Sequence, residues 1–167
     1  MSEVVTRKME AVDSGEVLTL QRAAYASEAQ LYGDPFLPPL VQTLDELRDE
    51  LVSGEGLVGL SGSRIVASVR WTVSDGIARI GRLIVAPDLQ GQGWGTKLLN
   101  FAERESGAAT AELFTGHLSE GSIRLYKREG YVESRREQIN DDLEFVHLTK
   151  NLAQMIDSKE WGGAFAQ

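Results

Sequence analysis

The sequence predicts an α/β (α+β) protein with one domain, built on a mixed, mostly antiparallel central sheet with helices on both faces. Two observations favour this class. In the first half of the chain, strand patterns are joined by Ser61-Gly62-Ser63 and by Asp75-Gly76, which are turns of antiparallel hairpins. In the second half, strand and helix patterns alternate, as parallel crossovers require. With 167 residues, 42% of them hydrophobic, the chain suits one domain with one core.

Each element follows from a local pattern. Asp13 or Ser14 is expected to cap the first helix, and Thr43 with Glu46 forms a capping box for the second. The segment 32–39 holds three of the four prolines and is expected to be a loop. The expected helices span 16–31, 44–52, 92–106 and 120–129. The expected strands span 4–12, 57–60, 64–73, 77–85, 111–115, 131–138 and 144–149.

The chain is expected to divide into a domain at 1–150 and a C-terminal tail at 151–167. Leu152, Met155 and Ile156 stand at helical spacing in the tail, which then becomes rich in glycine. We expect this tail to be helical in part, and a homodimer formed through it is one open alternative.

The most informative segment is the glycine-rich loop that follows the expected strand at 77–85. Gly91, Gly93 and Gly95 expose backbone N–H groups at the start of a helix, where the helix dipole favours an anion. The spacing matches neither a P-loop nor a dinucleotide fingerprint. The pattern that remains is Gln-x-x-Gly-x-Gly, beginning at Gln90, and its ligand is expected to be a phosphorylated cofactor.

This loop resembles the acyl-CoA pyrophosphate loop of the GNAT superfamily of N-acetyltransferases. A second segment, with Leu125, Tyr126, Gly130 and Tyr131, is similar to the Leu-Tyr-x-x-x-Gly-Phe/Tyr signature of the same superfamily. The two signatures occur here in the family's order and spacing. The resemblance implies a GNAT-like fold over 1–150, with acetyl-CoA as co-substrate.

The resemblance also assigns residues to the co-substrate. It implies that the backbone of Leu83, Ile84 and Val85 pairs with the pantetheine arm. Ser119 stands where the family often has an asparagine that contacts the pantetheine, and serine can keep a hydrogen bond there. The remaining expected contacts are Gln90, Gly91, Gln92, Gly93, Trp94, Gly95 and Thr96.

Two catalytic residues are expected, Tyr126 and His117. The resemblance makes Tyr126 the general acid that protonates the departing thiolate, and a phenol has a suitable pKa of about 10. Several family members carry a glutamate as the base on the strand before the second motif, but here that position is Phe114. His117 is the candidate base with the best pKa, and Glu28 and Glu144 are the alternatives.

The acceptor is expected to bind near the first helix and the loop that follows it, with Glu28 and Tyr32 as contacts. Arg70, Arg79 and Arg82 alternate with apolar residues on paired strands. They are candidates either to neutralise an acceptor carboxylate or to serve as solvent-facing cross-strand partners.

Composition excludes several other classes. A net charge of −8 argues against nucleic-acid binding, which requires a basic face. The chain has no cysteine and two histidines, so no metal site is expected. No run approaches the ~20 apolar residues of a membrane span, and the first ten residues lack the apolar stretch of a signal peptide. We therefore expect a cytoplasmic protein without a membrane partner.

The sequence thus predicts an N-acetyltransferase in which an amine attacks acetyl-CoA directly, without a covalent enzyme intermediate. The acceptor is expected to be a small-molecule amine, and a protein amino group is the other possibility. Two alternatives stay open: a non-catalytic acyl-CoA-binding sensor or interaction module, and a transferase for a longer acyl group.

Overall fold

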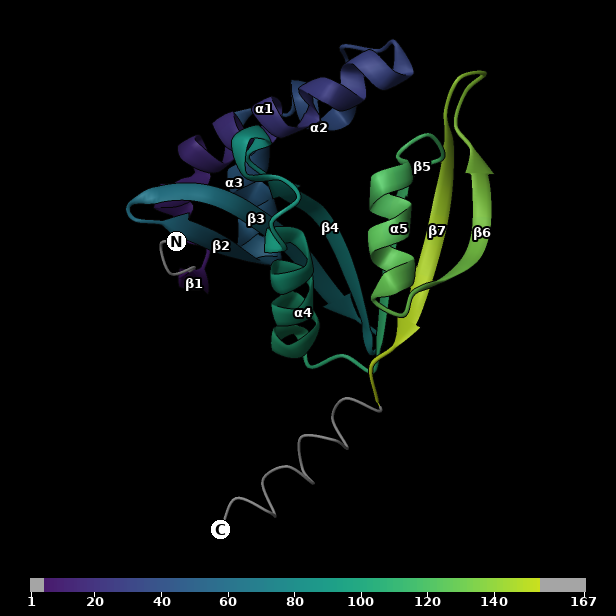
Figure 1. The fold of residues 1–167 in the computed structure, drawn as a ribbon. Coiled ribbons are helices and arrows are strands. Elements are labelled where there is room, and N and C mark those ends of the chain that lie inside the picture. The colour runs from purple at the N-terminus through teal and green to yellow at the C-terminus, as the bar shows by residue number, and fades with distance from the viewer. Residues whose placement is uncertain (1–4, 154–167) are drawn as a thin grey trace.

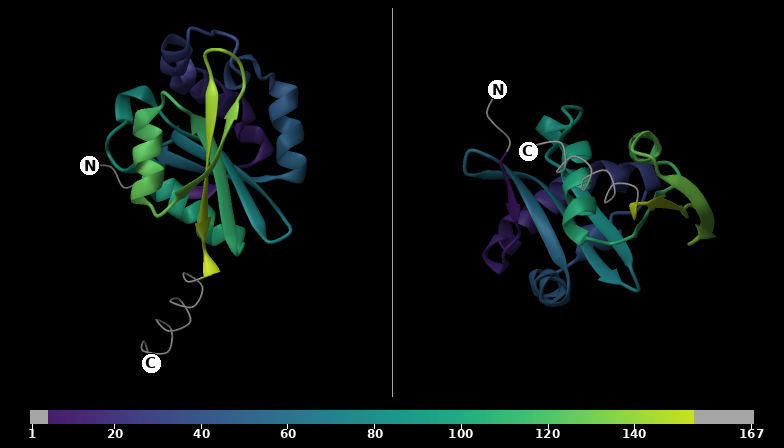
Figure 2. Two further views of the ribbon diagram at one scale, coloured as in Figure 1. Left: turned by 90° about the vertical axis from the view of Figure 1, so that its right-hand side faces the viewer. Right: turned by 90° about the horizontal axis from the view of Figure 1, so that it is seen from below.

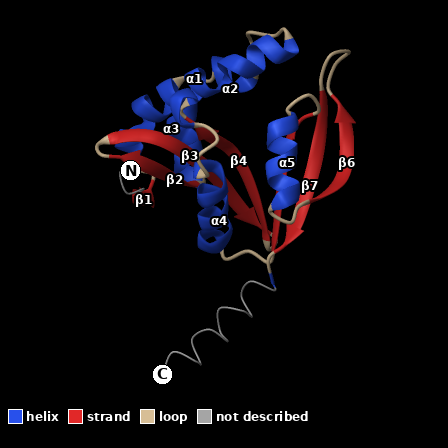
Figure 3. Cartoon of the chain, in the orientation of Figure 1, coloured by secondary structure: helices blue, strands red, loops and turns tan. Residues whose placement is uncertain are grey.

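Seven strands form one sheet, in the order β1-β2-β3-β4-β5-β7-β6. The structure is a computed structural model, and it describes residues 5–153 (Figure 1). The strands are β1 (Val5–Lys8), β2 (Glu55–Ser61), β3 (Arg64–Ser74), β4 (Ile77–Val85), β5 (Thr110–Gly116), β6 (Val132–Gln138) and β7 (Glu144–Asn151). The helices are α1 (Ser14–Tyr32), α2 (Pro38–Val41), α3 (Leu44–Ser53), α4 (Trp94–Ser106) and α5 (Glu120–Arg128) (Figure 3).

The sheet is mixed and mostly antiparallel, as the sequence predicts. Among the described strands, β4 and β5 pair in parallel, and every other neighbouring pair is antiparallel. The turns at Gly62 and Gly76 join β2 to β3 and β3 to β4, and both glycines have a positive φ. These turns need the left-handed backbone that glycine adopts without strain.

Helices cover both faces of the sheet, which confirms that part of the prediction. Arg70 of β3 reaches Gln21 of α1 and Glu50 of α3, whereas Gly59 of β2 faces Trp94 of α4. Figure 2 shows α1 and α3 on one side of the strands and α4 and α5 on the other. Every residue from 65 to 71 of β3 is buried, because both faces of this central strand are covered.

Several boundaries differ from the sequence prediction, and three of the differences have a local cause. The first strand ends at Lys8, and the short 3-10 helix η1 (Ala11–Asp13) leads into α1. The expected loop at 32–39 gives way to helix α2 at Pro38, a residue preorganised for a first helical position. Helix α4 begins at Trp94 rather than at 92, because Gly91 and Gly93 have positive φ values of 76° and 87°.

The described chain ends in contact with the core. Asn151 belongs to β7 and Leu152 is buried. The division at 150 stays a prediction, and residues 154–167 of the expected tail lie outside the described residues. Within residues 5–153, no helix is both long and apolar enough to cross a membrane.

Strand β4 separates from β5 after Arg79, and this separation opens a cleft. The two strands pair only where Ile77–Arg79 lies beside residues 110–112, although both continue further. Arg82 has a φ of 50°, and the pairing of β3 with β4 shifts register beside it. Such a bulge bends a strand and increases its twist. Figure 1 shows β4 and β5 together at one end and apart at the other.

Candidate active site

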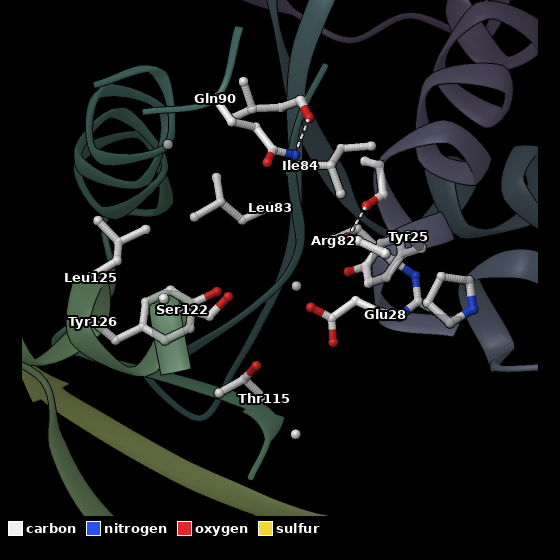
Figure 4. Close-up of a pocket in the computed structure, with 18 of the residues that line it drawn as sticks. Tyr25, Glu28, Arg82, Leu83, Ile84, Gln90, Thr115, Ser122, Leu125 and Tyr126 are labelled. Carbon is white, nitrogen blue, oxygen red and sulfur yellow. Dashed lines mark hydrogen bonds between the residues drawn. The ribbon is translucent and has the colours of Figure 1, made fainter. Parts of the chain in front are cut away.

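A cleft of about 690 Å³ opens between the separated strands. It is lined by α1, the second half of β4, the glycine-rich loop, the end of β5 and one face of α5. Figure 4 shows side chains from these elements converging on it. Most of the expected site residues line this cleft: Glu28, Tyr32, Leu83, Ile84, Val85, Gln90, Gly91, Gly93, Trp94, Gly95, Thr96 and Tyr126.

The glycine-rich loop forms an open site for an anion at one end of the cleft. Helix α4 has Gly93 as its N-cap, and no side chain caps its first N–H groups. A Cβ atom built at Gly91 or Gly93 would meet nothing within 4 Å. Arg128 of α5 lines the cleft and donates to the hydroxyl of Thr96 at 3.4 Å. Uncapped N–H groups, a helix dipole and a nearby guanidinium suit a pyrophosphate.

The edge of β4 supplies backbone groups along the cleft. Beyond Arg79 no described strand pairs with β4 on its β5 side, so within residues 5–153 the edge that carries residues 83–85 is free to pair with an extended ligand arm. The Gln90 side chain donates to the Val85 carbonyl at 3.3 Å, which joins the loop to the strand. The residues present therefore fit an acyl-CoA. The free edge of β4 can pair with its pantetheine arm, and the glycine-rich loop can bind its pyrophosphate.

Tyr126 faces the cleft from α5. Its side chain is 8% exposed, and its ring meets that of Tyr131 edge-on at 5.9 Å between centroids. Burial raises the pKa of the Tyr126 phenol, and the proximity of Tyr25 and Glu28 raises it further. The phenol thus keeps its proton at neutral pH, which a general acid must do before the reaction.

Glu28 lies opposite Tyr126 at the end of a hydrogen-bonded chain. The Ser119 hydroxyl donates to the Glu28 carboxylate at 2.7 Å, and the Tyr32 hydroxyl lies 2.8 Å from the Ser119 oxygen. The backbone N–H of Leu118 donates to the Tyr32 oxygen at 3.0 Å, so Tyr32 donates to Ser119 in turn. Figure 4 shows the Glu28 carboxylate directed across the cleft toward the side that carries Tyr126.

His117 lies outside the lining of the cleft. Its Nδ1 accepts a hydrogen bond from the backbone N–H of Glu144 at 3.0 Å, and its ring packs against Tyr32 at 5.9 Å between centroids. The Glu144 carboxylate pairs with Arg136 at 3.0 Å. Of the three candidate bases, Glu28 is the one that the structure places in the cleft.

Two expected co-substrate contacts do not line the cleft. Gln92 is exposed on the loop, and Ser119 is buried behind Glu28. Phe114 stands where several family members have a glutamate. It lines the cleft, and its ring packs against that of Phe145 with 4.6 Å between the centroids.

Sequence reasoning missed the conformation of Arg82 and the place of Thr115 and Ser122 in the cleft. One signal was available for Arg82: Gly81 precedes it within the strand pattern, and a glycine inside a strand often marks a bulge.

Comparisons with known proteins agree with this geometry. A family model described as an acetyltransferase (GNAT) domain matches residues 23–152. The aminoalkylphosphonate N-acetyltransferase of Salmonella typhimurium is 31% identical over 130 residues, which is 75% of this chain and 81% of that protein.

Two solved structures share the fold. The ribosomal-protein-S18-alanine N-acetyltransferase of Escherichia coli aligns with a TM-score of 0.76 at 17% identity, over 90% of this chain and 95% of that one. The PaiA N-acetyltransferase of Thermoplasma acidophilum, in complex with coenzyme A, aligns with a TM-score of 0.71 at 15% identity, over 89% and 99% of the two chains. The Salmonella relative is named as an N-acetyltransferase, so it gives no support to a non-catalytic sensor. The chain belongs to the GNAT acetyltransferase family and is an acyltransferase that uses acetyl-CoA as its co-substrate.

Proposed function

We propose that this protein transfers the acetyl group of acetyl-CoA to a small-molecule amine by direct attack, with Glu28 as the base and Tyr126 as the acid. The observation that carries the proposal is that Glu28 and Tyr126 approach one cleft from opposite sides. The curated relative at 31% identity is named for a small-molecule amine, an aminoalkylphosphonate, which favours a small acceptor over a protein amino group.

Each residue has a defined part in the step. Acetyl-CoA supplies a thioester as the acetyl donor. The acceptor nitrogen forms a bond to the acetyl carbon and gives a proton to the Glu28 carboxylate. As the carbon–sulfur bond breaks, Tyr126 gives its proton to the departing sulfur. A water relay then returns the proton from Glu28 to Tyr126, so that charge and protons balance.

The need for both groups follows from pKa values. An alkylamine with a pKa near 10.4 is neutral in only about one molecule in 10³ at neutral pH, so a base assists the attack. The burial that raises the pKa of the Tyr126 phenol also raises that of a thiolate in the same cleft, so the phenol stays a competent donor. Ser119 holds the Glu28 carboxylate in place through its hydrogen bond of 2.7 Å.

The test compares Tyr126→Phe and Glu28→Gln with the wild-type protein on a panel of small primary amines. We expect each variant to lose about 10²- to 10⁴-fold in kcat and to keep its thermal stabilisation by acetyl-CoA. Glu105→Gln is a matched control, because Glu105 is an exposed residue of α4.

Wild-type turnover by both variants would overturn the assignment of roles. Stabilisation by acetyl-CoA without turnover of any amine would instead revive the sensor interpretation. A cytoplasmic location and a homodimer remain predictions.

A further inference from the structure

A second cavity of about 500 Å³ adjoins the acetyl-CoA cleft. It is lined by the end of α3 and by residues of strands β2 to β7. The acetyl-CoA cleft and the second cavity share Ile80, Gly81, Arg82 and Phe114 as lining residues. The bulge at Arg82 therefore stands between the place of acetyl transfer and this second cavity.

Two arginines beside this cavity carry buried N–H groups without a partner. Arg70 is 6% exposed and is held by Glu50 at 2.9 Å through Nε and by Gln21 at 3.1 Å through Nη2. Among the described residues, its buried Nη1 has no hydrogen-bond partner, and the same is true of the buried Nε of Arg82. Buried N–H groups on charged side chains are costly to leave unpaired, and native structures rarely do so without a reason.

The other charged residues of this cavity already have opposite charges nearby. Arg79 lies 3.9 Å from Glu112 and Arg135 lies 3.3 Å from Glu137, while Glu55 lies 3.8 Å from Lys8. Within residues 5–153, Arg82 has no carboxylate at ion-pair distance.

The positive charges of Arg70 and Arg82 also influence one another. Burial lowers the pKa of Arg70, and the positive charge of Arg82 lowers it further against the effect of Glu50. Tyr25 lies close enough to both arginines for their charges to oppose the rise in its pKa that burial causes. Two cations held together in a protein with a net charge of −8 form a local site for an anion.

We propose that Arg82 and Arg70 bind an anionic group of the acceptor, so that the substrate is a small amine that also carries a carboxylate or a phosphonate. The amine end meets Glu28, which shares the cleft with Arg82, and the anionic end lies in the second cavity, which both Arg70 and Arg82 line. Guanidinium groups suit both anions because their planar N–H donors match two oxygens at once. This inference rests on the proposed function and names its substrate class.

The first experiment compares acceptors that differ only in the end opposite the amine: an aminoalkyl carboxylate, an aminoalkyl phosphonate, and the amino alcohol of equal length. We expect kcat/KM for the anionic acceptors to exceed that for the alcohol by about 10- to 100-fold, the range of a hydrogen bond to a charged group. The preferred anion distinguishes a carboxylate from a phosphonate substrate. An equal rate with the amino alcohol would overturn the inference.

The second experiment tests the residue. Arg82→Gln is expected to lower the preference for anionic acceptors to near unity, mainly through a higher KM. Arg82→Lys is expected to restore part of the preference, because it keeps the charge but not the planar donors. Arg64→Gln is the control, since Arg64 is an exposed arginine of β3 that pairs with Asp88 at 2.9 Å, outside both cavities. An unchanged preference in Arg82→Gln would overturn the assignment.

A binding measurement separates this inference from the proposed function. An alkyl phosphonate without an amine cannot be acetylated, but it should raise the melting temperature of the wild-type protein and not that of Arg82→Gln. If the protein acetylates amines that lack an anionic group, and the phosphonate does not raise its melting temperature, the anion site alone is refuted. The shift without acetylation of any amine would refute the proposed function and leave the anion site standing.

Discussion

Gly116, at the end of β5, leaves the space in which the Tyr32 hydroxyl lies. A Cβ atom at this position would overlap the Tyr32 hydroxyl and the ring carbon that carries it. That hydroxyl holds Ser119, which in turn holds Glu28. The orientation of the proposed base therefore depends on the absence of a side chain on a different element.

We predict that Gly116→Ala lowers kcat by at least 10-fold and destabilises the protein by about 1–3 kcal/mol, because the added methyl displaces Tyr32. Steady-state kinetics and urea unfolding measure the two effects. Gly15→Ala is the control, since a Cβ there meets nothing within 4 Å. Wild-type activity in Gly116→Ala would mean that the chain from Tyr32 to Glu28 is not needed.

Among the elements, α4 is joined to the far half of the sheet by a buried ion pair. Glu103 of α4 is 3% exposed and accepts from Lys150 of β7 at 3.0 Å and from the Tyr131 hydroxyl at 3.0 Å. The ion pair connects α4, which begins at the glycine-rich loop, to β7, which pairs with β5. It therefore helps to hold the two sides of the cleft in place.

We predict that Glu103→Gln destabilises the protein by about 3 kcal/mol, because it leaves the Lys150 ammonium, whose side chain is only 15% exposed, without its counter-charge. Glu105→Gln, an exposed change on the same helix, is expected to stay within about 0.5 kcal/mol of the wild type. Urea unfolding of both variants checks the difference. Equal stability of the two variants would show that the buried pair contributes little.

A second ion pair fixes the start of α1 to β1. Arg7 donates to both carboxylate oxygens of Asp13, at 2.7 and 2.9 Å, and the backbone N–H of Glu10 donates to one of them at 2.8 Å. The hydrogen bond from Arg7 lowers the pKa of Asp13, against the opposite effect of burial. A lowered pKa in the folded state means that ionised Asp13 stabilises the fold above its unfolded pKa of about 3.9.

We predict that Asp13→Asn costs about 1–2 kcal/mol at pH 7. The difference in free energy of unfolding between the variant and the wild type should narrow as the pH falls below about 4 and passes the pKa of Asp13 in the folded protein. Protonation then removes from the wild type the same charge that the substitution removes. Urea unfolding of both proteins at pH 7 and pH 3 measures this gap. A gap that is equal at both pH values would contradict the ionic contribution of Asp13.

At the scale of the whole molecule, one core cluster runs through the described chain. It includes residues from Met9, beside β1, to Leu152, after β7. Its members come from both sides of the cleft, among them Ile80 of β4 and Leu113 of β5. The two halves of the sheet therefore share one core although β4 and β5 separate.

We predict that the protein unfolds in one cooperative transition, with the same midpoint by circular dichroism and by the fluorescence of the buried Trp71 and Trp94. Acetyl-CoA at about 100 times its dissociation constant should add about 2.7 kcal/mol. NAD and ATP should add far less than CoA species do. Two separate midpoints would show that the halves on either side of the cleft unfold independently.

The sequence by itself determined the features that rest on short stretches of backbone. The hairpin turns, the glycine-rich loop and the Leu125–Tyr126 signature each depend on residues within a few positions of one another. Positive φ angles, helix capping and phosphate binding are short-range effects, so these features and the family could be predicted without coordinates.

Only the tertiary structure decided which side chains meet. Tyr32 and Ser119 are 87 positions apart, and Glu28 and Ser119 are 91 apart. The bulge at Arg82 sets where β4 leaves β5, and with it which residues face the cleft. His117 had the best intrinsic pKa for a base, but the structure ties its ring to the Glu144 backbone and leaves Glu28 in the cleft. Packing between elements that are distant in the sequence decides such contacts, and the short-range patterns of the sequence do not specify it.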